Sequence, residues 1–257
     1  MIEVSNLSFT PTGTEKAILK ELSFSLPKKG LTSIVGPNGS GKTTLLRCLL
    51  SLLAYSGSCK ISEKEASKYS RQEISKLISY IPQVGEHLPG FSVREFVELA
   101  RRPHFKNSFD RSNKHGSVVE DSLKLARCES FSSRLITSLS GGERQRVFVA
   151  AALAQETPMI LMDEPGAFLD PEHEEALFSL LSDLKAEKSI IVVSHDLNRC
   201  SVSSDNILAL KDGEKFYHGV PSGLVEEQKL IELYNRKFVF VKHPECQSKM
   251  ILPESVR

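Results

Sequence analysis

The sequence has no long hydrophobic run and almost no net charge. No stretch approaches the roughly 18 apolar residues that a membrane-spanning helix needs, and the longest candidate, residues 147–154, is far shorter. The 33 basic and 32 acidic residues leave a formal charge of +1, so no overall field favours nucleic acid. We therefore expect no nucleic-acid partner, and any membrane function requires a second chain.

Cysteine is scarce and scattered. The five cysteines, at positions 48, 59, 128, 200 and 246, form neither a C-x-x-C metal pattern nor an even disulfide set, which favours a reducing compartment. The first residues lack the basic segment and apolar core of a signal peptide, so we expect a cytosolic or peripheral protein. With 257 residues, 40% of them hydrophobic, the chain can form one large α/β domain or a core with a subdomain.

Glycine is concentrated in one short stretch, G-P-N-G-S-G-K-T-T, at residues 36–44. Residues 31–35 before it predict a buried strand, and residues 44–53 after it predict a buried helix. In this position, backbone N–H groups can surround an anion at the positive end of the helix. The spacing matches G-x-x-x-x-G-K-[ST], so we expect a nucleoside triphosphate site with Lys42 on the β- and γ-phosphates and Thr43 on Mg²⁺. A simple tight turn is the alternative.

The remaining chain divides by its periodicity. Residues 1–35 alternate as strands do, whereas residues 82–154 predict an inserted helical subdomain. In residues 155–257 strand and helix alternate again, which implies parallel strands with crossover helices in an α/β core, followed by a C-terminal tail. The individual predictions are helices at 92–101, 118–126, 171–188 and about 224–234, strands at 159–162, 189–194 and 238–241, and a hairpin at Asp212-Gly213.

Two carboxylates follow a second apolar run, M-I-L-M-D-E-P at residues 159–165. Ligands gather at the carboxyl ends of strands in open α/β sheets. Asp163 would bind Mg²⁺, and Glu164 would orient and polarise the attacking water. A strand that ends in a solvated acidic turn is the alternative, but the position downstream of a phosphate loop is what phosphoryl transfer requires.

A third pattern is L-S-G-G-E-R-Q-R at residues 139–146. Ser140 and Glu143 have the spacing of a capping box, ahead of a helix that runs to about Ala154. Two consecutive glycines in a helix cost about 1 kcal/mol each relative to alanine. They also leave bare amides at the positive end of the helix, which suits the close approach of a phosphate. A well-capped helix without a ligand is the alternative.

The L-S-G-G-[QE] pattern resembles the signature motif of ABC-type ATPases, and the resemblance covers essentially the whole chain. It implies a P-loop ABC-type α/β core with an N-terminal antiparallel β-subdomain and an inserted helical subdomain, as one ATPase domain over residues 1–257. In this family two ATPase subunits pack head to tail, so that each nucleotide lies between one subunit's P-loop and the other's signature. ATP would join this homodimer, and hydrolysis would part it.

The resemblance also assigns residue roles. His195, after an apolar strand, resembles the family's switch histidine at the γ-phosphate, and Gln83 resembles the lid glutamine that senses Mg²⁺ and links to the membrane partner. Phe9 would stack on adenine or belong to the β-subdomain core. Gly166 departs from the family, which usually has threonine there. The expected nucleotide-binding residues are Phe9, Gly36, Pro37, Asn38, Gly39, Ser40, Gly41, Lys42, Thr43, Thr44, Ser140, Gly141, Gly142 and Asp170; the catalytic residues are Lys42, Gln83, Glu164 and His195; the Mg²⁺ residues are Thr43, Gln83 and Asp163.

One further segment and a dipeptide near the C-terminus indicate which subgroup of ABC ATPases the chain resembles. Residues 93–104 resemble the V-R-E-x-V-x-x-G-R-x-P-[HW] segment of importers for iron-siderophores, haem and cobalamin, and the late His243-Pro244 is also similar to that subgroup. Periodicity alone predicts an ordinary amphipathic helix that Pro103 ends. The chain has one ATPase core without a fused membrane segment or sustained heptads, which favours an importer subunit. The alternative is a non-transport ABC protein that acts as an assembly scaffold, such as the iron–sulfur assembly type.

An importer subunit of this kind implies several partners. These are a separate integral-membrane permease and, indirectly, a substrate-binding protein, with the subunit at the cytoplasmic face of the plasma membrane. We expect the permease to dock in a groove near Gln83 and residues 91–96. Within that segment, Val93 and Phe96 are expected to be a core pair, and Phe91 an exposed contact.

Overall fold

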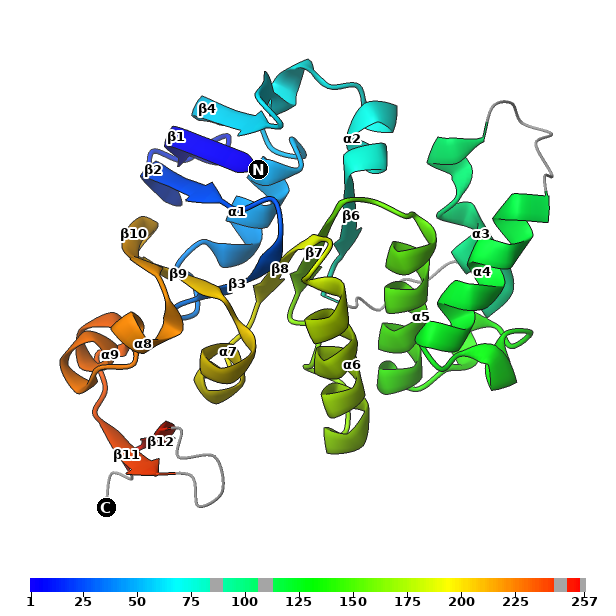
Figure 1. The fold of residues 1–257 in the computed structure, drawn as a ribbon. Helices are drawn as coiled ribbons and strands as arrows, with labels where there is room; N and C mark the ends of the chain where they lie inside the picture. Colours follow the sequence, from blue (N-terminus) through cyan, green and yellow to red (C-terminus); the bar gives the residue numbers. More distant parts are fainter. Residues whose placement is uncertain (84–89, 106–112, 243–248, 255–257) are drawn as a thin grey trace. The chain divides into compact units, whose positions relative to one another are not determined.

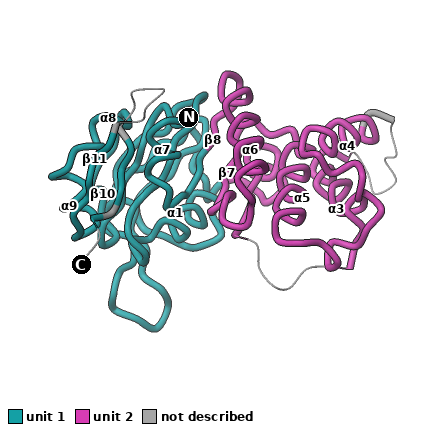
Figure 2. The backbone as a smooth tube through the Cα atoms, turned by 90° about the horizontal axis from the view of Figure 1, so that it is seen from below, with its two compact units in different colours: residues 1–68, 191–257 teal, residues 69–190 magenta. Residues whose placement is uncertain are grey.

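The computed structural model describes residues 1–83, 90–105, 113–242 and 249–254 of the chain. It divides into two compact units, which Figure 2 shows in different colours. Unit 1 comprises residues 1–68 and 191–257, and unit 2 comprises residues 69–190. The boundary falls inside strand β8 (Ser189–Val193). The architecture is α/β, as predicted.

The first sheet of unit 1 is antiparallel, with the strand order β2-β1-β4-β5. Its strands are β1 (Ile2–Phe9), β2 (Leu19–Leu26), β4 (Ser56–Ile61) and β5 (Lys64–Glu65). The predicted alternation of β1 and β2 is confirmed, since Val4 pairs with Phe24 and both side chains are buried. The sheet is not limited to residues 1–35, however, because β1 also pairs with β4, a strand that the sequence pattern did not reveal.

The second sheet of unit 1 contains the predicted P-loop strand. β3 (Gly30–Val35) pairs in parallel with β9 (Asn206–Lys211), and β9 forms a hairpin with β10 (Glu214–Gly219). The predicted hairpin turn is confirmed, with φ of 51° at Asp212 and 81° at Gly213. A Cβ atom on Gly213 would lie 2.2 Å from the backbone oxygen of Ile18, so only glycine permits this approach to the start of β2.

Unit 2 combines two parallel strands with a group of helices (Figure 1). Strand β6 (Ile78–Ile81) follows helix α2 (Arg71–Leu77) and pairs with β7 (Met159–Asp163), which precedes helix α6 (Pro171–Leu184). Between these strands lie α3 (Val93–Leu99), α4 (Asn113–Leu125) and α5 (Gly141–Ala154), and all three helices contact one another. Phe96 of α3 packs edge to face on Phe148 of α5, with ring centroids 5.2 Å apart.

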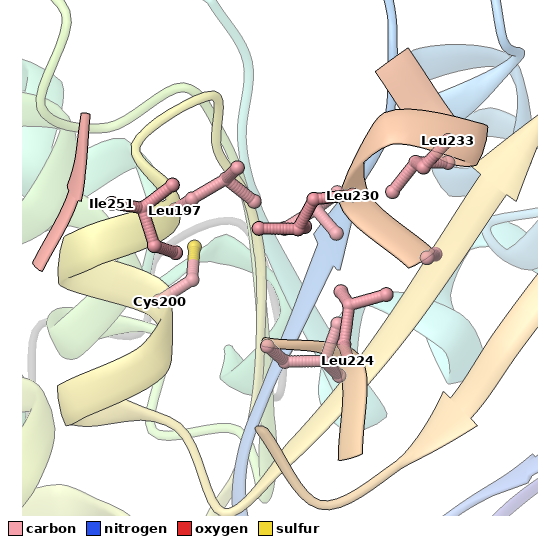
Figure 3. Close-up of a cluster of buried hydrophobic side chains, with 9 residues drawn as sticks. Leu197, Cys200, Leu224, Leu230, Leu233 and Ile251 are labelled. Carbon is pink, nitrogen blue, oxygen red and sulfur yellow. The ribbon is translucent and has the colours of Figure 1, made fainter. Parts of the chain in front are cut away.

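The C-terminal part of unit 1 corrects one prediction. Residues 224–234 do not form one helix but belong to two, α8 (Pro221–Leu224) and α9 (Glu227–Tyr234), which follow α7 (Leu197–Ser203) and β10. The break lets leucines of both helices enter one hydrophobic cluster with Leu197, Cys200 and Ile251 (Figure 3). The predicted strand at 238–241 is confirmed as β11 (Phe238–Lys242), which pairs with β12 (Lys249–Pro253). His243-Pro244 lies outside the described residues.

Within the described ranges, no helix combines the length and the apolar composition needed to cross a bilayer. Four cysteines, at positions 48, 59, 128 and 200, are buried free thiols. Burial raises the pKa of Cys48, Cys59 and Cys128 to about 12. These thiols are therefore protonated at neutral pH and carry little nucleophilic character.

We expect the Cys246→Ser variant, in which these four cysteines remain, to be almost unreactive toward Ellman's reagent under native conditions. After denaturation in guanidinium chloride, all four thiols should react. The wild-type protein provides the comparison for Cys246. Fast reaction of any of the four in native buffer would contradict their burial.

Candidate functional site: a phosphate loop and a bare helix terminus

The glycine loop lies between β3 and helix α1 (Lys42–Leu49), as predicted. Gly36, Gly39 and Gly41 have φ of 145°, 79° and 99°, which side-chain-bearing residues rarely adopt. A Cβ on Gly36 would lie 2.1 Å from the backbone oxygen of Leu210, and one on Gly41 would lie 2.5 Å from Cδ2 of Leu19. The loop conformation thus requires glycine at both positions.

Several polar donors converge on this loop. The Lys42 side chain is only 7% exposed, and its Nζ donates to the backbone oxygens of Gly36 and Pro37, both at 2.9 Å. Within the described residues, no side chain caps the N-terminus of α1, and Ser40 Oγ is buried without a hydrogen-bond partner. A bare helix terminus, a buried cation and an unused hydroxyl fit a ligand with several anionic oxygens. The loop therefore fits the phosphates of ATP.

The predicted acidic pair ends a strand in unit 2. All residues of β7 are buried, and Asp163 at its end is 2% exposed. Glu164 follows with φ of 54°, in the left-handed region that is uncommon outside glycine. Such a conformation stores local strain and often occurs where a side chain must be aimed.

The signature motif forms the N-terminus of α5, and its predicted capping box is confirmed. Ser140 Oγ accepts from the Glu143 N–H at 3.2 Å, and the Ser140 N–H donates to Glu143 Oε2 at 2.8 Å. The hydrogen bond from the Ser140 N–H to the Glu143 carboxylate is the main cause that lowers the pKa of Glu143. Positions for Cβ atoms on Gly141 and Gly142 lie 3.3 Å from Phe168 Cβ and 3.1 Å from Phe168 O. The two glycines thus lie directly against the loop before Asp170.

That loop contains Gly166, the position at which the sequence departs from the family pattern. Asp170 caps α6, because its Oδ1 accepts from the His173 N–H at 2.9 Å, and this hydrogen bond is the main cause that lowers its pKa. A Cβ on Gly166 would lie 3.0 Å from Glu174 Oε1. The carboxylate of Glu174 therefore occupies the space that a larger residue at position 166 would need.

The remaining predicted residues lie at strand ends. Phe9 is half-buried at the end of β1, while Gln83 and His195 are exposed after β6 and β8. Phe9, Lys42 and His195 belong to unit 1, whereas Gln83 and the signature belong to unit 2. The described residues of each unit contain no cluster of three or more His, Cys, Asp or Glu side chains that could hold a metal by itself.

Comparison with known proteins agrees with this geometry. Residues 19–167, more than half of the chain, match the ABC transporter family. The chain belongs to the ABC transporter family. As a member it is an ABC ATPase, and the ATP-binding class predicted from the phosphate loop and signature is confirmed.

Its relatives in this family include ATP-binding subunits of iron uptake. An iron chelatin transport ATP-binding protein of Helicobacter pylori is 37% identical over 95% of this chain and 96% of its own length. The petrobactin import ATP-binding protein FpuC of Bacillus anthracis is 36% identical over 86% and 82%. The iron(3+)-hydroxamate import ATP-binding protein FhuC of Bacillus subtilis is 32% identical over 93% and 90%. The predicted resemblance to iron-chelate import ATPases is therefore confirmed.

Solved ABC structures have the same fold. A metal-chelate type ABC transporter in an inward-facing conformation superposes with a TM-score of 0.83, at 25% identity over 99% of this chain and 97% of that one. The ATP-binding cassette MJ0796, a dimer bound to ADP and Pi, has a TM-score of 0.78 at 28% identity over 86% and 99%. The predicted ABC ATPase fold is confirmed.

The sequence pattern missed the contacts that hold the C-terminal end of α5. Arg101, 2% exposed, donates to the Ala154 carbonyl and pairs with Glu156 Oε2 at 2.7 Å. His104 Nε2 lies 2.7 Å from the Gln155 carbonyl oxygen. Both basic residues belong to the importer-like segment 93–104, and only the composition R-R-P-H hinted at them. A cation at a helix C-terminus is favourable because the last carbonyls are otherwise unpaired.

We expect Lys42→Ala to weaken ATP binding roughly 10- to 100-fold, because hydrogen bonds to charged groups are worth about 1.5–3 kcal/mol. Titration with a fluorescent ATP analogue measures the affinity. Lys60→Ala, an exposed lysine on β4, is the matched control. Equal affinity in the two variants would contradict the role of Lys42.

Proposed function

We propose that this chain is the ATP-hydrolysing subunit of an importer for a metal chelate such as iron-siderophore, haem or cobalamin, with a separate permease in the membrane. The observation that carries the proposal is the 37% identity to an iron chelatin transport ATP-binding protein along nearly the full length of both chains. The subunit would act at the cytoplasmic face of the plasma membrane, where permease loops are accessible.

The proposed chemistry follows from the side chains at the strand and helix ends. Lys42 would turn from the two carbonyls that it now contacts to the β- and γ-phosphates, and Ser40 would donate to the same group. Thr43, Gln83 and Asp163 would hold Mg²⁺, which neutralises charge on the phosphates when bound. Glu164 would orient the attacking water, and His195 would contact the γ-phosphate. The half-buried Phe9 would stack on adenine.

A second copy completes the site in this proposal. Gly141 and Gly142, in the first turn of α5, carry no side chains, so the γ-phosphate bound on a partner's loop could approach their backbone amides closely. The dimeric cassette bound to ADP and Pi supports an assembly of this kind. Binding of ATP would then join two subunits head to tail, and hydrolysis with release of phosphate would part them.

We expect Glu164→Gln to retain ATP binding but to lose nearly all hydrolysis, since the amide cannot accept a proton from water. The variant should elute as a dimer in size-exclusion chromatography with ATP and Mg²⁺, and as a monomer without ATP. Glu172→Gln, an exposed change on α6, is the control and should hydrolyse ATP as wild type does. A monomeric Glu164→Gln protein with wild-type turnover would exclude this catalytic role.

The docking face is proposed at Phe91, whose side chain is 40% exposed, next to the fully buried Val93. The Val93 N–H donates to the Arg134 carbonyl at 2.9 Å, and the Ile136 N–H donates to the Phe91 carbonyl at 3.0 Å. Arg134 in turn pairs with Glu143 of the signature capping box at 3.0 Å. A permease helix seated on Phe91 would thus press on the segment that leads into α5.

We expect Phe91→Asp to reduce co-purification with the permease about 30-fold, the effect of an interface hot spot worth about 2 kcal/mol. ATPase activity of the isolated subunit should be unchanged. Val202→Asp, at an equally apolar side chain that is 70% exposed on α7, is the matched control.

In this experiment the subunit is purified from membranes together with the permease encoded beside its own gene. Uptake of iron-siderophore, haem and cobalamin is then measured. If wild type recovers no integral-membrane protein, and its deletion impairs none of the three uptakes, the importer proposal is wrong. The assembly-scaffold alternative would then take its place.

A further inference from the structure

Helix α7 begins directly after the proposed switch histidine, and it is too short to be stable alone. It has seven residues, fewer than the roughly 12–15 below which isolated helices are marginal in water, so tertiary contacts must hold it. Just after its end, Ser204 Oγ and Ser33 Oγ of β3 share a hydrogen bond of 2.6 Å. The contacts at its start matter more for His195, which lies only two residues before Leu197, the first residue of the helix.

The start of α7 is bound to the C-terminal strand pair β11–β12 by one amide side chain. Asn198 Nδ2 donates to the Ile251 carbonyl at 3.0 Å, and the Ile251 N–H donates to Asn198 Oδ1 at 2.6 Å. On the opposite edge of β12, Ile251 is paired with Phe240 of β11. The Asn198 amide, which offers both a donor and an acceptor, thus takes the place that a third strand would have beside β12.

Apolar contacts reinforce this junction. Leu197, Cys200 and Ile251 belong to one buried hydrophobic cluster, and Figure 3 shows their side chains next to one another. Ile251 is 4% exposed, whereas Asn198 at the margin of the cluster is partly buried. The first turn of α7 is therefore held on β12 by polar and apolar groups together, although Asn198 and Ile251 are 53 positions apart in the chain.

The switch histidine lies between two anchored residues. On one side, the Ser194 N–H donates to the Ile34 carbonyl of β3 at 3.2 Å. On the other, Asp196 caps α7, because its Oδ1 accepts a backbone N–H of the first turn at 2.9 Å. This cap exists only while the first turn, which contains Asn198, is formed. The His195 side chain is exposed, so its placement depends on the backbone on either side more than on surrounding packing.

We propose that Asn198 is a positioning residue for ATP hydrolysis: it holds the start of α7 on β12 and thereby holds His195 where its side chain reaches the γ-phosphate. The inference rests on the role given to His195 in the proposed function. Displacement of a group at the reacting phosphate lowers the rate more than the affinity for ATP, since most of the binding contacts come from the glycine loop. The β11–β12 pair then supports catalysis without contacting the nucleotide.

The test compares Asn198→Ala and Asn198→Asp with wild type in the full-length protein. Alanine removes both hydrogen bonds, and aspartate keeps the side-chain volume but sets a carboxylate oxygen against the Ile251 carbonyl. We expect kcat to fall about ten-fold or more in both variants, while ATP affinity changes by no more than about two-fold. Ser201→Ala, which removes a hydrogen bond to the Asn198 carbonyl within α7, is the matched control and should hydrolyse ATP as wild type does.

A double-mutant cycle with His195→Ala separates positioning from a general loss of structure. If Asn198 acts through His195, Asn198→Ala should change kcat little once His195→Ala is present. An equal loss of kcat in both backgrounds would overturn the inference, as would wild-type kcat in both Asn198 variants. Wild-type turnover in His195→Ala alone would instead contradict the proposed role of His195, and the inference would fail with it.

Asn198→Asp keeps the proposal testable if Asn198→Ala does not fold, because a carboxylate in the first turn of a helix is favourable. Amide hydrogen exchange followed by NMR tests the contact itself. The Ile251 N–H should be protected in wild type and in Ser201→Ala, and it should exchange at least about ten-fold faster in Asn198→Ala. An unprotected Ile251 N–H in the wild-type protein would overturn the inference.

Discussion

The uncapped N-terminus of α1 is the constraint on which the nucleotide site depends. Ser70, Ser92, Ser140, Asp170 and Asp196 each accept a backbone N–H at the start of their helices. At α1 the corresponding residue is Gly41, which has no side chain to offer. Free N–H groups and the helix dipole then favour an external anion. Helix α1 therefore lacks the stabilisation of about 1 kcal/mol that a side-chain cap provides, and its N-terminal N–H groups are left for a phosphate to bind.

In unit 2, helix α5 begins with the signature glycines, as α1 of unit 1 begins at the glycine loop. Contacts from segments distant in the sequence hold both ends of α5. At its N-terminus Arg134 pairs with Glu143 at 3.0 Å, and at its C-terminus Arg101 and His104 bind the carbonyls of Ala154 and Gln155. These basic residues lie on either side of α4 in the chain. Contacts outside α5 therefore fix both of its ends, and the segment that follows Phe91 is tied to its N-terminal end through Arg134.

The sequence predicted those features whose cause is local. The capping box at Ser140, the turn at Asp212-Gly213 and the glycine loop each depend on residues within a few positions of one another. The break between α8 and α9 was missed because it arises from packing, where leucines on both sides of the break enter one core. Strand β4 was missed for a similar reason, since its pairing partner β1 lies about 50 positions earlier. Likewise, Arg101 binds the Ala154 carbonyl 53 positions further along the chain, a partner that the local R-R-P-H composition does not identify.

The loop between Glu164 and Asp170 shows how a departure from a family pattern can be accommodated. Without a side chain at Gly166, the Glu174 carboxylate comes within 3.0 Å of the vacant Cβ position, so the space is filled from α6. On the other side of the loop, Phe168 lies against Gly141 and Gly142, which are small enough to let it approach. The loop is therefore packed between the start of α6 and the start of α5. Glycine at positions 141, 142 and 166 is what permits this packing on both sides, since a side chain at any of them would meet Phe168 or Glu174 at 3.0–3.3 Å.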